Sequence, residues 1–526
     1  MHAAELDTDA SLAAMVVRSC ARHAGRPAFS QAGRTLGYVE FERLSAAFAD
    51  WLRVESGLQP GDRVALMLPN LLQYPVALAG VWRAGMVVVN VNPQYTAREL
   101  QHQLADSGAR AIVALDTLAP RLRGVTSATA LRRTVLTGSS DMTQSDTGAS
   151  AGWPEGSVRW LDLLARTPSS PDAPVSRDDI ALLQYTGGTT GVSKGAVLTH
   201  GNLLSNLSQG ARCYGTLLQP GEETVATVLP LYHIFGLSFN ALLMLHFGAH
   251  NRLVSSPRDL GEIRATLAAG CTVLSGVNTL YASLLDAPAL ADVDLRGLKL
   301  CVAGGTATQP EVAARWLRRS GRPIADGYGL TEASPFVLSG LPEGPRERGM
   351  FPMPDTQVEV RGADGRVLPP GTPGEIVVRG PQVMRGYWRQ PEETARVLDA
   401  EGWLHTGDIG VADAQGAFAI TDRVKDMVLV SGFNVYPNEV EAVLSGHPDV
   451  AECAVVGMPD ARTGEAVQAF VVPRRAGVDV QALLQHCRAG LTAYKVPRQI
   501  VFVECLPKSP VGKVLRRELR TERFPQ

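Results

Sequence analysis

Lysine is scarce in this chain of 526 residues, although basic residues are not. Most of the 50 basic residues are arginine, and the only lysines are Lys194, Lys299, Lys425, Lys495, Lys508 and Lys513. The chain also lacks an excess of charge of either sign, because its formal net charge is −2. Without such an excess no bulk field attracts nucleic acid or an anionic surface. We therefore expect no nucleic-acid partner and only local binding sites.

Cysteine and long apolar runs are sparse as well. The seven cysteines are scattered without a C-x-x-C spacing, which argues against a disulfide framework or a metal ribbon. The first thirty residues carry Glu5, Asp7 and Asp9 and lack an apolar run, so we expect no secretory signal. The longest uncharged stretch, 224–251, contains Pro230 and is too polar to span a bilayer, which needs about 20 apolar residues. It predicts a buried helix in a cytoplasmic protein, and peripheral contact with the inner face of the membrane and a homodimer stay open.

Short β-branched runs alternate with longer amphipathic segments along the chain. The runs 64–68, 111–115 and 299–303 predict strands, and the segments 97–104 and 311–319 predict helices. This alternation is typical of an α/β fold in which layered sheets are flanked by helices. No period of 20 to 50 residues repeats, which argues against a solenoid.

The pattern changes near residue 423, where we expect a domain boundary. We predict a large N-terminal domain over 1–422, a hinge over 423–426 and a small, mobile α+β C-terminal domain over 427–526. The elements expected in the small domain are strands at 427–430, 451–456, 467–472 and 499–504, and helices at 438–445, 480–491 and 514–520.

A glycine-rich segment, YTGGTTGVSKG at 185–195, directly follows the apolar run 180–183. Four glycines let successive backbone N–H groups converge on an anion, and four hydroxyl side chains and Lys194 add donors and charge. This composition predicts a phosphate-binding loop. It is not a Walker A loop, because the only Gly-Lys pair is Gly512-Lys513, and Pro507 stands where the first glycine of that motif should be.

The same segment offers an alternative function. Gly191-Val192-Ser193-Lys194-Gly195 matches the G-x-S-x-G elbow of serine hydrolases. Such an elbow sits directly at the end of a strand, whereas residues 186–190 intervene here. A hydrolase with Ser193 as its nucleophile is therefore the remote alternative.

Six segments, in order from residue 185 to residue 513, carry a resemblance to a known family. They are the glycine-rich loop, GYGLTE at 327–332, WLHTGD at 403–408, DRVK at 422–425, SGFNVYPNE at 431–439 and PKSPVGK at 507–513. Together they resemble the signature series of the adenylate-forming (ANL) superfamily, specifically acyl-CoA synthetases of the bacterial long-chain fatty acid CoA ligase type. Four of the six lysines lie in these segments, as expected where a point charge at phosphate cannot be exchanged for a guanidinium.

The resemblance implies an AMP-forming ligase that uses ATP and Mg²⁺ to convert a fatty acid into acyl-AMP and pyrophosphate. Coenzyme A then displaces AMP to give acyl-CoA. Two alternatives share this fold: a fatty acyl-AMP ligase that stops at the adenylate, and a ligase for an aryl or short-chain acid. A catalytically silent binding protein is disfavoured because Glu332, Asp408 and Lys513 are all present.

The resemblance also implies roles for individual residues at the nucleotide. The β- and γ-phosphates would be held by Thr186, Gly187, Gly188, Thr189, Thr190, Gly191 and Lys194. Thr331 would donate to the α-phosphate, and Glu332, with Thr186, would hold Mg²⁺, a cation that prefers oxygen ligands. The ribose would lie on Asp408 and Arg423, and the base and the acyl carboxylate would lie against Gly304, Gly305, Thr306, Ala307, Asp326, Tyr328 and Gly329, with Tyr328 stacked on adenine.

The remaining roles concern the second substrate and the acid. By resemblance, Lys513 would bridge the acyl carboxylate and the α-phosphate, Lys425 would be the hinge, and Gly432 and Phe433 would leave room for pantetheine. His233 would stand at the mouth of the acyl pocket. No Asp or Glu occurs from residue 224 to residue 258, where relatives that activate amino acids carry an acidic residue, so we expect an apolar acid. The segment 335–352 looks shortened, which leaves the chain length of that acid open.

Overall fold

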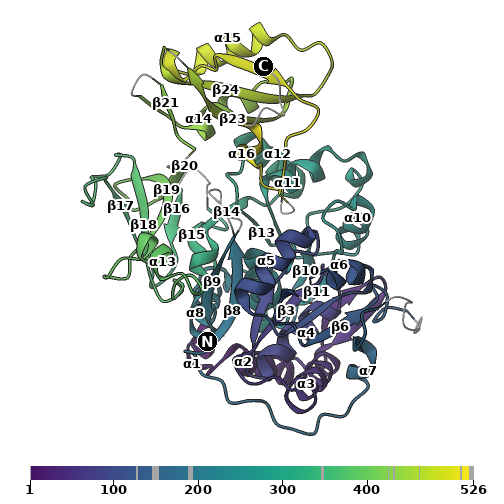
Figure 1. Cartoon of the computed structure of the whole chain (residues 1–526). Coiled ribbons are helices and arrows are strands. Elements are labelled where there is room, and N and C mark those ends of the chain that lie inside the picture. Colours follow the sequence, from purple (N-terminus) through teal and green to yellow (C-terminus); the bar gives the residue numbers. More distant parts are fainter. Residues whose placement is uncertain are drawn as a thin grey trace.

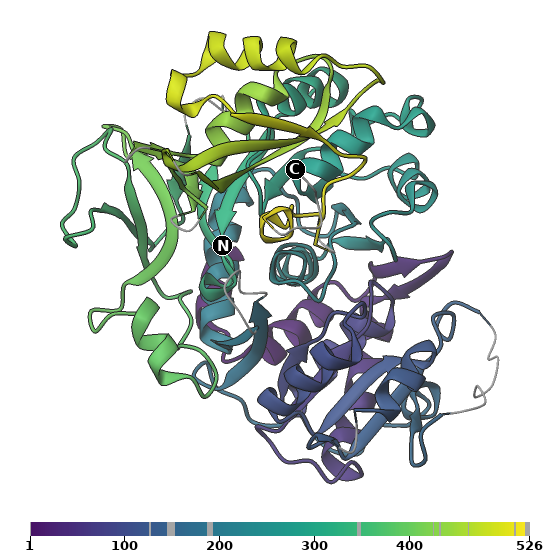
Figure 2. The same cartoon turned by 45° about the horizontal axis from the view of Figure 1, so that its top comes forward.

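The computed structural model describes residues 2–125, 128–144, 153–186, 193–344, 349–423, 426–430, 433–460, 462–509 and 512–520. Within these ranges the strands form three sheets, and the fold is α/β. In Figures 1 and 2 the C-terminal residues, in yellow-green and yellow, form a separate lobe at the top of the molecule. The other two sheets and their helices make up the rest.

The first sheet is nearly all parallel and runs in the order β7-β6-β5-β3-β4-β8-β9. Its strands are β3 (Arg63–Met67), β4 (Val87–Asn90), β5 (Ala111–Leu115), β6 (Arg133–Thr137), β7 (Val158–Arg159), β8 (Ile180–Thr186) and β9 (Lys194–Thr199). Its helices are α3 (Tyr38–Val54), α4 (Gln73–Arg83), α5 (Ala97–Ser107), α6 (Ala119–Arg123) and α7 (Trp160–Leu164). The predicted strands and helix in this part are confirmed. The strands could be predicted from the sequence because strands that are buried on both faces form continuous apolar runs.

The second sheet follows the order β17-β18-β19-β20-β16-β15-β14-β13-β12-β10-β11-β1-β2. Its strands are β1 (Pro27–Gln31), β2 (Arg34–Gly37), β10 (Thr224–Thr227), β11 (His250–Leu253), β12 (Val273–Gly276), β13 (Leu300–Gly304), β14 (Ile324–Gly329), β15 (Phe336–Gly340), β16 (Met350–Pro352), β17 (Gln357–Arg361), β18 (Gly374–Arg379), β19 (Leu404–Ala412) and β20 (Phe418–Arg423). β1 pairs in parallel with β11, which lies far along the chain. The sheet therefore joins the first residues of the chain to its middle.

Helices α8 (His200–Tyr214), α10 (Leu260–Ala268), α11 (Asn278–Asp286), α12 (Pro310–Ser320) and α13 (Pro391–Val397) accompany this sheet. The prediction of one buried helix over 224–251 is right only for the middle of that stretch. There a π-helix (Gly236–Leu243) runs into α9 (Met244–His246), and all eleven of these residues are buried. The ends are strands β10 and β11, which pair with each other. The β-branched residues of β10 favour a strand over a helix.

The third sheet contains the order β22-β21-β24-β23, with β25 added on β24. Its elements are β21 (Val428–Val430), β22 (Phe433–Val435), β23 (Val450–Asp460), β24 (Gly464–Pro473), β25 (Gln499–Phe502), α14 (Pro437–Ser445), α15 (Val480–Gly490) and α16 (Arg516–Leu519). The chain changes from the second sheet to the third between Arg423 and Val428. Every predicted element here has a counterpart, whereas the short strand β22 was not predicted.

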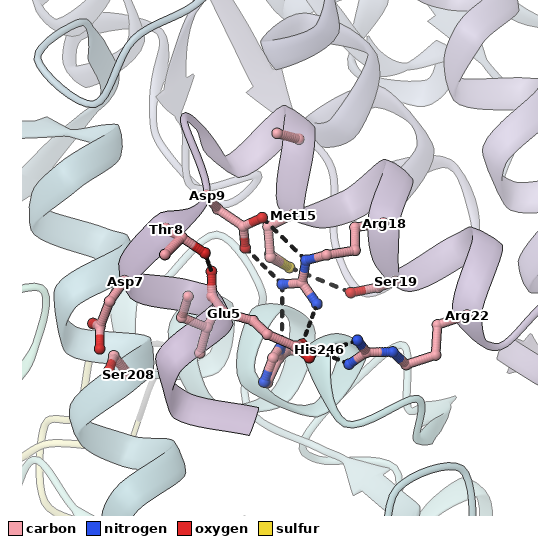
Figure 3. A network of polar contacts seen from close by, with 12 residues as sticks. Glu5, Asp7, Thr8, Asp9, Met15, Arg18, Ser19, Arg22, Ser208 and His246 are labelled. Carbon is pink, nitrogen blue, oxygen red and sulfur yellow. Dashed lines mark hydrogen bonds and ion pairs between the residues drawn. The ribbon is translucent and has the colours of Figure 1, made fainter. Parts of the chain in front are cut away.

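The first helix, α1 (His2–Thr8), is held to the body of the protein by a network of charges (Figure 3). Arg18, on α2 (Leu12–Arg22), donates to Asp9 at 2.6 and 3.0 Å and to Glu5 at 2.9 Å, and Arg22 donates to Glu5 at 2.6 and 2.7 Å. Arg22 lowers the pKa of the Glu5 carboxyl. On the other side, the Ser208 hydroxyl of α8 lies 3.4 Å from a carbonyl of α1. The network thus fixes the beginning of the chain against α8, the helix that follows β9.

Candidate active site

The glycine-rich segment joins β8 to β9, which are antiparallel neighbours at one edge of the first sheet. Thr186 ends β8 and lies opposite Lys194, which begins β9. Gly187, Gly188, Thr189, Thr190 and Gly191 lie outside the described residues. The Lys194 ammonium forms an ion pair with Glu393 and lies 4.9 Å from the centre of the Tyr387 ring. A cation therefore stands at the start of β9, directly after the predicted phosphate-binding loop.

Tyr387 links this cation to the predicted metal ligand. Its hydroxyl donates to Glu332 Oε1 at 2.7 Å. Burial, together with the neighbouring Glu332 carboxylate, raises the pKa of Tyr387, so the phenol stays protonated. Lys194 in turn lowers the pKa of Glu393. Cation, phenol and carboxylates thus form one connected cluster, and the phenol holds Glu332 in a fixed orientation.

The turn that carries Thr331 and Glu332 is held by hydrogen bonds on both sides. The Met384 N–H donates to the Glu332 carbonyl at 2.8 Å. The Ser334 hydroxyl donates to the Gln382 carbonyl at 2.8 Å, and the Ser238 hydroxyl of the π-helix donates to the Ser334 carbonyl at 2.9 Å. Buried polar groups satisfied in this way keep a turn rigid.

Asp408 lies on β19 and is only 4% exposed. Its carboxylate accepts a hydrogen bond from the Tyr328 hydroxyl at 2.7 Å, and its N–H donates to Thr406 Oγ1 at 3.0 Å. Arg423 lies opposite Asp408 in the β19–β20 ladder. A carboxylate has about four acceptor sites, and the prediction that Asp408 accepts the ribose hydroxyls stays a prediction.

The turn after β13 contains the predicted residues Gly304 to Ala307. Gly305 has φ +79°, a conformation that favours glycine. A Cβ on Gly304 would lie 3.2 Å from the Phe235 ring and 3.2 Å from the Gly327 carbonyl, so only glycine fits there without displacement. The buried Thr306 hydroxyl has no hydrogen-bond partner within the described residues. An orphaned buried hydroxyl is a feature that a bound ligand would satisfy.

Aromatic rings continue from this turn into the protein. Phe235 lies 5.6 Å from Phe336 and 6.0 Å from Phe239, and Phe239 lies 6.0 Å from Phe336. Asp326 is paired with Ala303 on the neighbouring strand. Phe235, Phe239 and Phe336 make the wall behind this turn apolar. The π-helix contributes no carboxylate to it, because its sequence contains no Asp or Glu.

His233 and Lys513 are far apart in the sequence but close in the structure. Burial, and secondarily the Lys513 ammonium, lower the pKa of His233 to about 4, so its imidazole is neutral at pH 7. The segment of Lys513 is also in contact with the large domain, because the Thr279 hydroxyl lies 3.5 Å from the Gly512 carbonyl. The structure thus places a C-terminal cation beside the predicted acyl-pocket residue.

The structure describes only some of the residues predicted to act with coenzyme A or at the hinge. Phe433 is 57% exposed and stacks on Tyr494 with ring centres 4.9 Å apart. Gly432 and Lys425 lie outside the described residues, and so does the side chain of Arg423. Their roles stay predictions.

The hydrolase alternative is wrong. A nucleophile elbow needs a sharp turn from a strand into a helix. Here Ser193 directly precedes β9, so the segment connects two antiparallel strands. The Ser193 carbonyl lies 3.2 Å from His102 Nε2, which ties this residue to α5.

Two absences are relevant to the chemistry. Within the described ranges, no group of three or more His, Cys, Asp and Glu side chains could by itself hold a metal ion. In the same part of the chain no helix is both long and apolar enough to cross a membrane.

Tyr387 and Glu393 were missed in the sequence. Lys194 and Glu393 are separated by 199 positions, and no short motif contains both. Tyr387 follows Gly386 in a run that looks like an ordinary turn. Only the fold brings these side chains to Lys194 and Glu332.

Comparisons with known proteins identify the family to which this chain belongs. Residues 16–388 match the model of the AMP-binding enzyme family, and residues 439–513 match that of the AMP-binding enzyme C-terminal domain. The protein named long-chain-fatty-acid–CoA ligase in Escherichia coli O6:H1 is 46% identical over 533 residues, which cover 97% of this chain and 94% of that protein.

Solved structures agree with the sequence comparison. ATP-bound MatB from Rhodopseudomonas palustris has a TM-score of 0.85 at 30% identity, covering 95% of this chain and 98% of that one. The anthranilate CoA ligase AuaEII in complex with anthranoyl-AMP has a TM-score of 0.90 at 25% identity, covering 99% and 98%. Both similarities extend over nearly the whole of each chain.

Proposed function

Since this chain belongs to the AMP-binding enzyme family, we propose that it is an ATP-dependent fatty acid:CoA ligase. The observation that carries this proposal is the chain-long similarity to a protein named long-chain-fatty-acid–CoA ligase. The apolar wall of Phe235, Phe239 and Phe336 supports a hydrocarbon substrate, because apolar pockets bind ligands of matching polarity.

In the first half-reaction, a carboxylate oxygen of the fatty acid attacks the α-phosphorus of ATP. The bond from that phosphorus to the bridging oxygen breaks, and pyrophosphate leaves. Lys194 and Thr186, with the residues of the glycine-rich loop, would hold the β- and γ-phosphates, and Thr331 would donate to the α-phosphate. Lys513 would stand between the acyl carboxylate and the α-phosphate, where negative charge concentrates.

Glu332 fits the magnesium ion that this family resemblance implies. Its carboxylate supplies a hard oxygen ligand, and Tyr387 orients it. When bound, Mg²⁺ neutralises charge on the phosphates. Asp408 would accept the ribose hydroxyls, and the Thr306 hydroxyl would lose its orphaned state against the bound nucleotide or the acyl carboxylate.

In the second half-reaction, the thiol sulfur of coenzyme A attacks the acyl carbon, its proton is released, and AMP leaves. Gly432 and Phe433 would border the path of pantetheine. The use of ATP and coenzyme A, both abundant in the cytoplasm, supports a cytoplasmic location. Peripheral contact with the inner face of the membrane would deliver a sparingly soluble acid, and vesicle sedimentation with the pure protein tests that contact.

The test of the function is AMP release in the presence of ATP, Mg²⁺ and coenzyme A, with acids from acetate to oleate. We expect the highest rate for acids of roughly eight or more carbons, because each buried CH₂ contributes about 0.8 kcal/mol. A maximum at acetate, an aryl acid or an amino acid would overturn the substrate class. Accumulation of acyl-AMP without acyl-CoA would instead identify a fatty acyl-AMP ligase.

A further inference from the structure

A chain of buried polar side chains runs from the first sheet to the loop that carries His233. Its members are Asn70, Tyr74, Asn90 and Gln184, and none is more than 5% exposed. Buried amides are costly unless they are hydrogen-bonded, so a connected set of them fixes whatever it touches. All four are outside the signature segments, and the inference below rests on the proposed function.

Asn70 and Tyr74 hold the backbone of the loop that carries His233. Asn70 Nδ2 donates to the Leu229 carbonyl at 3.0 Å, and Asn70 Oδ1 accepts from the Leu231 N–H at 2.8 Å. The Tyr74 hydroxyl lies 2.8 Å from the Leu231 carbonyl and 2.7 Å from Asn90 Oδ1. Leu229 and Leu231 are thus fixed through their backbone, independently of their own side chains.

Asn90 and Gln184 connect the first sheet to Tyr232, the residue before His233. Asn90 Nδ2 donates to Gln184 Oε1 at 2.9 Å, and Gln184 Nε2 donates to the Tyr232 carbonyl at 3.1 Å. Asn90 and Gln184 are direct partners in the β4–β8 ladder, so the strand register sets their separation. Among the described residues, the Gln184 amide connects this ladder directly to the His233 loop at Tyr232.

Gln184 also has a fixed relation to the phosphate loop. It lies on β8 two residues before Thr186, and residues two apart on a strand face the same side. One side chain therefore ties the strand that opens the phosphate loop to the loop of the acyl-pocket histidine. A displacement of either would be felt by the other through this amide.

We propose that Gln184 is a positioning residue that sets His233 relative to the phosphate-binding strand and so aligns the acyl carboxylate with the α-phosphate. It touches no substrate and acts through the Tyr232 carbonyl. A misplacement of about 1 Å at a reacting group costs up to roughly 100-fold in rate. We therefore expect Gln184 to have a large effect on the adenylation rate, although it does not take part in the reaction.

The experiment replaces the amide by an isosteric thioether, Gln184→Met, and measures pyrophosphate release with varied oleate and varied ATP. We expect the kcat of adenylation to fall about 10- to 100-fold and the KM for the acid to rise at least about fivefold, with the KM for ATP unchanged. A merely structural defect would lower the fraction of active enzyme and move neither KM.

Gln103→Met is the matched control. Gln103 is a fully buried glutamine on α5 that donates to the Asn90 carbonyl at 2.7 Å and makes no hydrogen bond to the His233 loop. We expect its acid KM to stay at the wild-type value. Equal effects of the two substitutions on the acid KM would overturn the positioning role.

A second variant, Tyr74→Phe, tests the proposal if the Gln184→Met protein does not fold. Tyr74→Phe removes the hydroxyl that contacts the Leu231 carbonyl and Asn90 Oδ1, and we expect it to raise the acid KM in the same direction by a smaller factor. An unchanged acid KM in Tyr74→Phe would overturn the proposal on its own. Failure of the proposed function is seen separately, because wild-type protein would then release no pyrophosphate with any fatty acid.

Discussion

Lys513 is partly buried, unlike a fully solvated loop residue. Its ammonium acts on His233, a residue of the large domain, from the C-terminal segment. Removing one preorganised donor from a site of developing charge costs about 10²- to 10³-fold in rate. We predict that Lys513→Ala slows acyl-adenylate formation by at least this factor, measured as pyrophosphate release in a single turnover.

The same variant should convert supplied acyl-AMP and coenzyme A at close to the wild-type rate. Lys513→Arg should also be impaired in adenylation, because a planar guanidinium does not replace a compact ammonium. If Lys513→Ala adenylates within about threefold of wild type, the assigned role is wrong.

Tyr387 offers a second test at the scale of single residues. Its hydroxyl orients Glu332, and its ring faces the Lys194 ammonium. Tyr387→Phe keeps the ring contact and removes only the hydrogen bond. Loss of a group that orients a metal ligand typically weakens metal binding by 10- to 100-fold. We predict a rise of about tenfold or more in the Mg²⁺ concentration for half-maximal adenylation, and an unchanged Mg²⁺ titration would remove Tyr387 from the metal site.

At the scale of elements, α16 is docked through one guanidinium. Arg516 donates to Glu441 on α14 at 2.8 and 2.9 Å, and it lies 3.8 Å from Asp422, at the end of β20, and 3.6 Å from Asp426. Burial raises the pKa of Glu441. Breaking a buried pair by removing one partner typically costs about 3–5 kcal/mol. We predict a loss of this size for Arg516→Met.

The pH dependence of that loss has a definite sign. Arg516 lowers the pKa of Glu441, so its removal raises that pKa further. A protonated, neutral Glu441 needs no cation, so the loss of Arg516 destabilises the fold only at pH values where Glu441 would be charged. The variant should therefore be closest to wild type near pH 5 and furthest from it near pH 8, as measured by the urea midpoint at both pH values. A loss independent of pH would indicate that packing of α16, not its charge, is what Arg516 provides.

Elements were predictable from the sequence where one local rule decided them. β13 begins one residue after the start of the predicted run 299–303. This run could be predicted because it is apolar and lies between the Gly297 turn and Gly304. β22 was missed, because three residues directly after a glycine carry no pattern of their own and become a strand only by pairing with β21. In the candidate site, the motifs contain Lys194, Glu332, Tyr328 and Asp408, whereas Glu393 and Tyr387 lie outside them and reach Lys194 and Glu332 only through the fold.

At the scale of the whole molecule, the described residues of the small domain contact the large one through polar groups on several segments. The Gln309 amide donates to the Ser445 hydroxyl at 3.0 Å, Arg474 lies 3.6 Å from Asp286, and the Asn438 N–H donates to Asp422 at 2.8 Å. Polar interfaces are typical of domains that move relative to each other. A rotation that withdraws Lys513 for the second half-reaction would break these contacts and bend the chain between Arg423 and Val428.

The hinge prediction can be tested in that linker. Proline fixes φ near −65°, and domain rotation requires changes in φ and ψ at a few linker residues. We predict that Lys425→Pro retains adenylation and loses thioester formation, with the two half-reactions assayed separately. Lys425→Ala serves as the control for loss of charge. Unchanged overall turnover in Lys425→Pro would place the hinge elsewhere.

The pairing of β1 with β11 has a consequence for synthesis on the ribosome. β1 leaves the ribosome early, but its parallel partner follows roughly 220 residues later, which takes about 10 to 45 seconds at 5–20 residues per second. Until then β1 has only β2 beside it, and an isolated hairpin is marginally stable in water. The nascent chain thus exposes an unpaired strand edge for many seconds. Chaperone demand and the yield of truncated fragments should both change sharply once residue 253 has emerged.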